Sequence, residues 1–245
     1  MKGSMDGGGC FPTGRHYPGI AHLLSVSFEG LAKEWPADTP MTDIPYASLD
    51  TETTGRSADA DRVIEVGIVI FRDGEPTEQK GWLIQPERPI PPDATAIHGI
   101  TDADLEGKPI FSEVMPEILE TLQGVLPLAY NASFDRGFLM EELKRAGTPE
   151  ELPPAFRRKV RWADPLTWAR ELQKEHRSRA LGDVCERLGI SLENAHRATD
   201  DADAAGRVMA AFLKDQRVPP TYGAFMKEQE RLDKQFAFER QRWRR

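Results

Sequence analysis

Apolar residues from Tyr46 onward fall first into short runs that are typical of β-strands. Three such runs, rich in Val, Ile and aromatic residues, occur at 46–54, 63–72 and 80–86. Turn-forming residues lie between them, including the pair Asp73-Gly74, which favours a tight connection between strands. The pattern therefore predicts three consecutive strands at the start of a folded domain.

Beyond residue 110, helical and strand-like periods alternate before helices take over. The expected elements are a helix at 112–123 interrupted by Pro116, a strand at 125–131, a helix at 134–146, a fifth strand at 160–165, and helices at 165–174, 180–189 and 198–214. This order predicts an α/β fold in which a mixed five-stranded sheet is flanked by helices on both faces.

The two ends of the chain differ from this middle part. Residues 1–44 form a leader rich in Gly and Pro, with a candidate amphipathic helix marked by Ile20, Leu24, Phe28, Leu31 and Trp35. We expect an arm that packs on the domain at 45–215. The remaining stretch, 216–245, predicts a basic helix with an apolar seam. That helix would either bind a protein partner, a second copy of the chain or nucleic acid, or fold back onto its own domain.

Composition limits the classes of protein that this chain can belong to. A chain of 245 residues with 39% hydrophobic residues can bury one sizeable core. The net charge of -8 excludes a general nucleic-acid coat, which relies on abundant Lys and Arg. Cys10 and Cys185 match neither a zinc cluster nor a disulfide framework. With no apolar run of roughly 18 residues, we expect a cytoplasmic protein that does not enter a membrane.

Acidic residues and one histidine form the clearest chemical signal. Asp50 and Glu52 alternate along the first strand, so their side chains leave the same face and a divalent cation between them would keep both ionised. An isolated pair of this kind is usually a solvated strand edge. The polar turn that follows, beginning at Thr53, instead favours the approach of a nucleotide.

Two further carboxylates follow later in the chain. Asp135 falls near the start of a predicted helix, where it could cap the helix, hold a metal, or do both. Asp201 lies on another predicted helix, and His196 cannot share its face unless the histidine lies in the preceding loop. We therefore expect a loop-borne histidine that can accept a proton. Asp200 is the rival to Asp201 as a ligand.

Taken together, the segments DTETTG, NASFD and HRATDDA, supported by IHGIT at 97–101 and ADPLTWAR at 163–170, resemble the motifs of the DEDDh family of 3′→5′ exonucleases. Proofreading subunits of bacterial DNA polymerase III and their stand-alone relatives are the most similar members. The resemblance covers about residues 45–215 and implies a ribonuclease H-like fold with two Mg²⁺ or Mn²⁺ ions.

The resemblance also implies a role for each motif residue. Asp50 would bridge both metals, Glu52 and Asp201 would complete the ion on the nucleophile side, and Asp135 would serve the other ion. His196 would be the general base. The terminal nucleotide would lie against Thr53, Ile97, His98, Asn131 and Phe134.

Some of these pocket assignments have an alternative. Ile97 and Phe134 could equally be ordinary core residues. Tyr130 departs from the family pattern, which often has histidine before the Asn.

The expected function is therefore hydrolysis of DNA from single-stranded or frayed 3′ ends, with release of nucleoside 5′-monophosphates. An exoribonuclease that trims RNA 3′ ends is the first alternative, and a binding or scaffold module is the second. Basic residues between Arg157 and Arg161 would either guide a strand toward the metals or form solvated surface.

Overall fold

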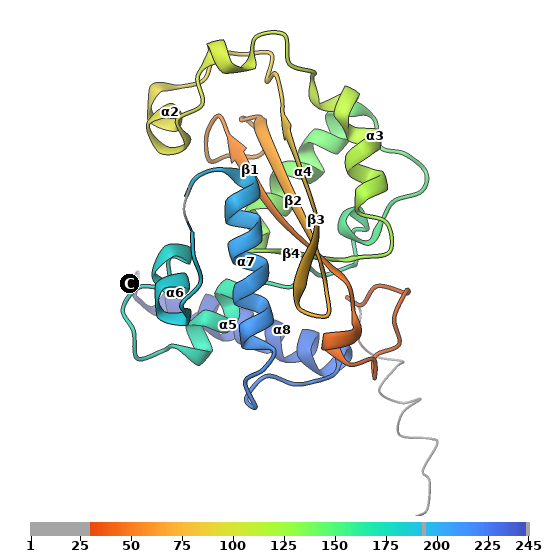
Figure 1. Cartoon of the computed structure of the whole chain (residues 1–245), viewed down its shortest axis with the longest axis vertical. Helices are drawn as coiled ribbons and strands as arrows, with labels where there is room; N and C mark the ends of the chain where they lie inside the picture. The colour runs from red at the N-terminus through yellow and green to blue at the C-terminus, as the bar shows by residue number, and fades with distance from the viewer. Residues whose placement is uncertain (1–29, 193–194, 244–245) are drawn as a thin grey trace, which may run out of the picture.

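The computed structural model describes residues 30–192 and 195–243 and arranges them around one sheet (Figure 1). Its strands are β1 (Tyr46–Thr53), β2 (Val63–Arg72), β3 (Glu75–Leu83) and β4 (Leu126–Ala129). Their order is β3-β2-β1-β4, with β1 antiparallel to β2 and parallel to β4. Asp73 and Gly74 both have positive φ, at 53° and 78°, and join β2 to β3 by the expected tight turn. The mixed sheet is confirmed.

The predicted fifth strand at 160–165 is wrong, because the sheet in the described part of the chain has four strands. Ala163 alone bridges β4, pairing in parallel with Leu128. The chain then leaves the sheet because the side chain of Asp164 caps the next helix and Pro165 occupies its first position. A proline fixes φ at the value that suits the first turn of a helix and ends the strand.

Helices cover both faces of this sheet (Figure 1). They are α2 (Pro92–His98), α3 (Phe111–Thr121), α4 (Ala132–Ala146), α5 (Pro165–Leu172), α6 (Leu181–Leu188), α7 (Ala198–Phe212) and α8 (Tyr222–Trp243), with short 3-10 turns at Met41–Asp43, Asp102–Leu105 and Pro154–Phe156. The sequence pattern did not predict α2. Pro116 lies inside α3 without interrupting it, because burial of the apolar face holds the helix together.

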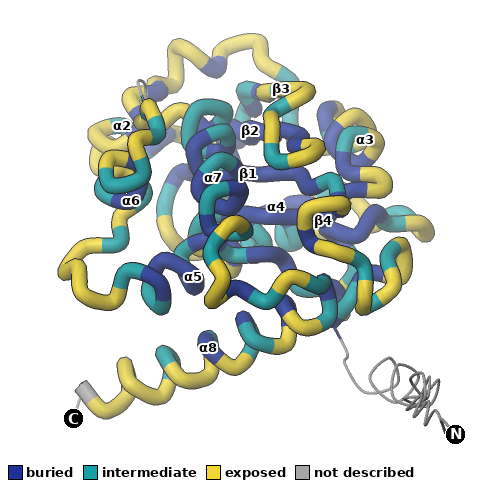
Figure 2. The backbone as a smooth tube through the Cα atoms, turned by 60° about the horizontal axis from the view of Figure 1, so that its bottom comes forward, coloured by how far each residue is buried: buried dark blue, intermediate teal, exposed yellow. Residues whose placement is uncertain are grey.

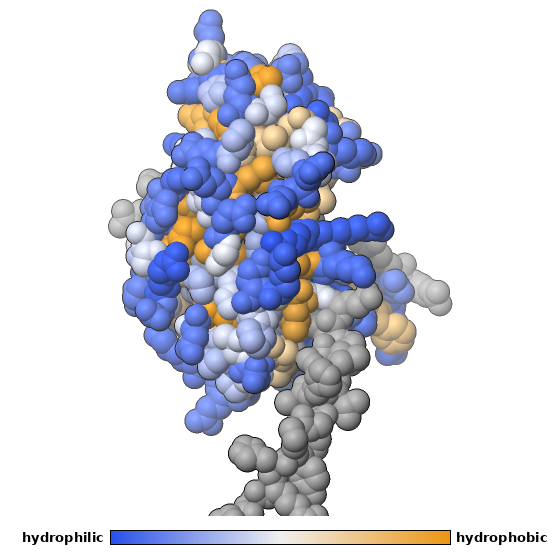
Figure 3. All heavy atoms as spheres, turned by 90° about the vertical axis from the view of Figure 1, so that its right-hand side faces the viewer, coloured by the Kyte–Doolittle hydropathy of each residue, from blue (hydrophilic) through white to orange (hydrophobic). Residues whose placement is uncertain are grey.

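Successive side chains of β1 point to opposite faces of the sheet and belong to two separate core layers. Tyr46 packs with residues of α5, α6 and α7 on one face, whereas Ala47 and Leu49 pack with α3 and α4 on the other. The face on the side of α3 carries mostly hydrophilic side chains with smaller apolar patches between them (Figure 3). Among the described helices, none is long and apolar enough to span a bilayer.

The C-terminal helix α8 folds back onto its own domain over its first half. Phe225 and Leu232 are fully buried in the core layer that contains α7, and Phe236 packs against it. The second half of α8 is largely exposed and extends away from the domain (Figure 2). The seam predicted from the sequence therefore contacts the chain itself.

The described part of the leader, from residue 30, meets α8 at its first turn. The backbone N–H of Ala32 donates to the Tyr222 hydroxyl at 2.8 Å, and the ring of Trp35 lies edge-on to that of Tyr222 at 6.1 Å. The helix expected around Ile20, Leu24 and Phe28 lies outside the described residues.

Candidate active site

Three of the predicted residues meet at the carboxyl end of β1. The ligand atoms of Glu52, His196 and Asp201 all lie within 4.8 Å of one another. Glu52 and Asp201 are partly buried and His196 is exposed. Two carboxylates and an imidazole at this spacing can hold a divalent cation or position a water molecule.

A glycine on β2 allows this convergence. Gly67 lies opposite Asp50 in the strand register, and a Cβ atom at this position would overlap the backbone of Ala198 and Thr199. The first turn of α7 therefore packs directly on the sheet. This close approach brings Asp201, in the same turn, to the carboxylates of β1.

Asp135 reaches the same region from α4, which covers the opposite face of the sheet. Its side chain is 2% exposed, and its Oδ1 accepts a hydrogen bond from the Thr51 hydroxyl at 2.9 Å. Asp135 is not needed as a helix cap, because the backbone N–H groups of Asn131 and Ala132 donate to the carboxylate of Asp164, both at 3.0 Å.

The four carboxylates repel one another in a desolvated site. Burial raises the pKa of Asp50 well above its ordinary value, and the charges of Asp135 and Asp201 raise it further. Burial, followed by the charge of Asp201, raises the pKa of Glu52 to about 8. Burial also raises the pKa of Asp135 to about 7, against the opposing effect of the Thr51 hydrogen bond. Burial likewise raises the pKa of Asp201. Bound cations would relieve this repulsion.

His196 lies in the loop before α7, as its spacing from Asp201 predicted. Its backbone has a φ of 70°, which is uncommon for a non-glycine residue, and its N–H donates to Oδ2 of Asp201 at 2.9 Å. The same carboxylate thus fixes the backbone of the histidine and contributes to the acidic cluster.

Glu65, which the sequence motifs did not single out, anchors this loop. Glu65 is 3% exposed on β2, opposite Glu52 in the register. Its carboxylate pairs with Arg197 at 2.8 Å and accepts the N–H of Ala198 at 3.2 Å. A charged residue inside the apolar run VIEVGIVIF was the available signal, because a buried carboxylate needs partners.

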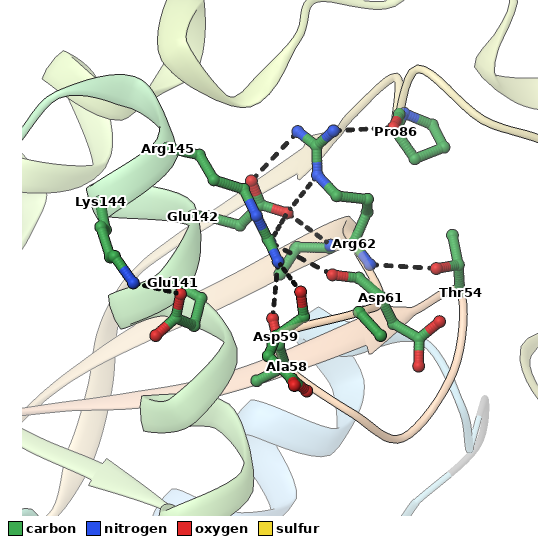
Figure 4. Close-up of polar contacts among 12 residues, drawn as sticks. Thr54, Ala58, Asp59, Asp61, Arg62, Pro86, Glu141, Glu142, Lys144 and Arg145 are labelled. Atoms are coloured by element: carbon green, nitrogen blue, oxygen red, sulfur yellow. Dashed lines mark hydrogen bonds and ion pairs between the residues drawn. The ribbon is translucent and has the colours of Figure 1, made fainter.

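A second missed group holds the loop between β1 and β2 (Figure 4). Glu142 on α4 is 1% exposed and accepts two hydrogen bonds from the guanidinium of Arg62, at 2.8 and 3.1 Å. Arg145 also bonds Glu142, and it donates to the backbone carbonyls of Ala58, Asp59 and Asp61. This loop follows shortly after Glu52 in the chain. The helix α4 therefore supports the site at its start, through Asp135, and at its end, through Glu142 and Arg145.

The residues predicted to hold a nucleotide have different environments. His98 is buried in α2 and interacts with the backbone of Thr53. Burial lowers the pKa of His98, and the neighbouring His196 lowers it further, while Glu65 opposes both. Thr53 is also buried, and its hydroxyl donates to the carbonyl of Gly55 at 2.6 Å.

The other predicted pocket residues differ in exposure. Ile97 is 49% exposed, so it is not a core residue. Phe134 is partly buried and packs against the core, with its ring 4.8 Å from that of Phe138. Asn131 is exposed in a left-handed conformation just before α4.

Comparison with known proteins assigns the family. Residues 48–209 match the exonuclease family. This chain belongs to that family. A PolC-type DNA polymerase III of Streptococcus suis (strain 98HAH33) is 33% identical over 213 residues, which cover 84% of this chain and 14% of the relative. The chain thus spans a small part of the curated relatives that it matches.

Solved exonuclease structures share the fold. Exonuclease X in complex with 5′ overhanging duplex DNA has a TM-score of 0.57 and 24% identity, covering 73% of this chain and 97% of that one. Exonuclease I of E. coli in complex with a dT13 oligonucleotide has a TM-score of 0.61 and 19% identity, covering 71% and 42%. The ribonuclease H-like fold expected from the motifs is confirmed.

The donor set of the site suits hard divalent cations. Asp50, Glu52, Asp135 and Asp201 offer carboxylate oxygens, which Mg²⁺ and Mn²⁺ prefer. Burial raises the pKa of all four carboxyl groups, so a bound cation would favour their ionised forms. A candidate divalent-metal site is therefore present.

Proposed function

We propose that this protein is a metal-dependent 3′→5′ exonuclease that removes nucleoside 5′-monophosphates one at a time from the 3′ end of DNA. The convergence of Glu52, His196 and Asp201 within 4.8 Å, with Asp50 and Asp135 electrostatically linked to them, carries the proposal. A structural role alone gives no reason for a fold to bury so many like charges together.

In this proposal the four carboxylates hold two Mg²⁺ or Mn²⁺ ions, and His196 acts as general base. When bound, the ions would lower the pKa of the attacking water and stabilise the departing 3′ oxygen. The exposed imidazole of His196 would take the proton from that water. Asp201 fixes the histidine backbone through the hydrogen bond to its N–H, so it would help to set the direction in which the proton moves.

The end of the strand would be recognised between α2 and the start of α4. Ile97 presents an exposed apolar side chain on α2, which suits stacking or wedging against a base. Asn131 and Phe134 lie at the start of α4, within one turn of Asp135. Thr53 and His98 would form the floor of the pocket, since both are buried next to the end of β1.

DNA is favoured as the substrate by the relatives of this chain. The curated relative at 33% identity is a DNA polymerase, and two exonucleases with the same fold were solved with DNA. The same carboxylate chemistry could cleave RNA, so the sugar must be tested directly.

A nuclease assay tests the proposal. Oligonucleotides of matched sequence, DNA and RNA, labelled at the 5′ end, are incubated with Mg²⁺, with Mn²⁺ or with EDTA, and the products are separated by length. We expect a ladder of DNA products shortened from the 3′ end, with EDTA abolishing it. Faster cleavage of RNA would reassign the substrate, and no cleavage of either polymer would reject the function.

A histidine variant tests the base. His196→Ala should lower the hydrolysis rate by about a hundredfold or more, which is typical of losing a general base. His176→Ala is the matched control, because His176 is an exposed histidine in the loop after α5. Equal rates in the two variants would reject His196 as the base.

A further inference from the structure

A cavity of about 750 Å³ lies beside the acidic cluster, on the far side of β4. Its walls come from the start of α4, the segment 158–162, α5 and one face of α8. Gln229, Asp233 and Arg240 line it from α8, and their spacing places them on one face of that helix. We call this cavity the basic groove.

Cations dominate the lining of the basic groove. Two carboxylates, Asp164 and Asp233, face six cationic side chains, those of Arg136, Arg158, Lys159, Arg161, Arg170 and Arg240. Both carboxylates are already engaged, since Asp164 accepts backbone N–H groups and Asp233 accepts the Thr167 hydroxyl at 2.6 Å. The groove therefore has an excess of positive charge in a chain whose net charge is -8.

Most of these arginines lack a carboxylate partner. Arg161 pairs with Glu230 at 2.8 Å. In the part of the chain that the structure describes, Arg136, Arg158, Arg170 and Arg240 form no ion pair. Unpaired guanidinium groups that share a concave surface are an attractive site for phosphate oxygens.

Crowding of these charges is visible at two positions. Nε of Arg136 is buried with no hydrogen-bond partner among the described residues. Burial and the charge of Arg240 lower the pKa of Arg170, although the carboxylates of Asp164 and Asp233 partly oppose them. An anion between these side chains would relieve both the desolvation and the repulsion.

The groove also lies next to the start of α4, which carries one residue of the proposed active site. Asn131 and Ala132 line it, and Asp135 lies within one turn of them on α4. β4 lies between β1 and Ala163, and the neighbours of Ala163 in the chain, Trp162 and Asp164, line the groove.

From these contacts we propose that the basic groove binds the phosphate backbone of the substrate strand a few nucleotides before its 3′ end. The inference rests on the proposed function and names the part of the site that would hold the strand. Arginine contacts to phosphates carry no sequence information, so the groove would raise affinity for any DNA strand long enough to reach it.

Binding measured without catalysis tests this inference. Fluorescein-labelled dT12 and dT4 are titrated in EDTA, and fluorescence anisotropy gives the affinity at several salt concentrations. The variant Arg158→Gln/Arg240→Gln removes two exposed groove cations, so it should fold normally. The control Arg72→Gln/Arg231→Gln removes two exposed cations outside the groove, and Arg231 lies on the opposite face of α8 from Arg240.

We expect the groove variant to bind dT12 at least about tenfold more weakly than the control, because it loses two charged contacts to phosphates. The slope of log affinity against log salt should fall by about 1.4, at roughly 0.7 for each lost phosphate contact on a single strand. Affinity for dT4 should change by less than about twofold. Arg136→Gln should repeat the pattern more weakly.

Equal dT12 affinity in the groove and control variants would overturn the inference, as would an equal loss for dT4 and dT12. The nuclease assay reports separately on the proposed function. A chain that binds dT12 through the groove but cleaves nothing would reject the nuclease and leave the groove, whereas cleavage with unchanged binding would reject the groove alone.

Discussion

The guanidinium of Arg197 lies 2.8 Å from the carboxylate of Glu65. The ion pair joins the residue after His196 to the centre of the sheet, and the same carboxylate accepts the first backbone N–H of α7. Glu65 therefore fixes both the start of α7 and the loop that carries the histidine. In the proposed reaction it would be a positioning residue, because it would act through His196 and Asp201.

Removal of this anchor should impair turnover more than binding. Glu65→Ala is expected to lower kcat by about tenfold or more, since small displacements of catalytic groups are costly, with KM changing little. Glu65→Gln should recover a larger share of kcat, because its amide oxygen can still accept the Ala198 N–H. Steady-state kinetics at a temperature where both variants are folded would check this. A rise in KM as large as the fall in kcat would contradict a positioning role.

Gly67 offers a test of the close packing between β2 and α7. Gly67→Ala places a methyl group into the backbone of Ala198 and Thr199, and overpacking of this kind costs about 1–3 kcal/mol. We expect a lower melting temperature and a large loss of nuclease activity. Gly182→Ala is the control, because nothing lies within 4 Å of its added Cβ in α6. It should be neutral or stabilise by up to about 1 kcal/mol.

The two adjacent aspartates of α7 should have unequal importance. Asp201 belongs to the cluster with Glu52 and His196, whereas Asp200 lines a separate surface cavity with Asp203 and Arg207. Asp201→Asn should lower kcat by about a hundredfold or more, in the range seen when a key electrostatic group is removed. Asp200→Asn should change it by less than about threefold. The reverse order in kinetic measurements would mean that Asp200 supplies the ligand.

Metal and pH should act together on the stability of the fold. Carboxyl groups whose pKa is higher in the folded state than in the unfolded chain stabilise the fold at low pH, and that stability is lost as pH rises through the folded value. For Glu52 and Asp135 the folded values are about 8 and about 7. In EDTA, the melting temperature should therefore fall between pH 5 and pH 8.

Added Mg²⁺ should reverse this loss, with a larger increase in melting temperature at pH 8 than at pH 5, because bound cations favour the ionised carboxylates. Thermal unfolding by circular dichroism at both pH values, with and without Mg²⁺, provides the measurement. Asp135→Asn is the control that should weaken the dependence. An equal effect of Mg²⁺ at both pH values would show that the cluster is not where the ion acts.

Much of the fold could be predicted because local pattern and tertiary structure agree. The strands β1 and β2 and the helix α4 have periodicities that match their burial, and Asp73-Gly74 has the turn chemistry that a hairpin requires. The fifth strand was overpredicted since VRW has strand-like composition, yet Asp164 and Pro165 start a helix immediately after it. Periodicity cannot reveal that a single bridge replaces a strand.

The site shows a similar division. The loop position of His196 followed from helix geometry, because a residue five positions before Asp201 on a continuous helix would not lie on the same face. Glu65 and Glu142 were missed because their partners, Arg197 and Arg62, lie 132 and 80 positions away in the sequence. Burial of a carboxylate becomes visible only when the strands and α4 are packed together.

The joint at Tyr222 has a practical consequence for protein engineers who wish to shorten this chain. Its hydroxyl accepts the Ala32 N–H and its ring faces Trp35, so the segment from residue 30 packs against the first turn of α8. Removing either segment would expose apolar side chains of the other to solvent. A minimal fragment for crystallisation should therefore keep both pieces, even though Ala32 and Tyr222 are separated by 190 positions in the sequence.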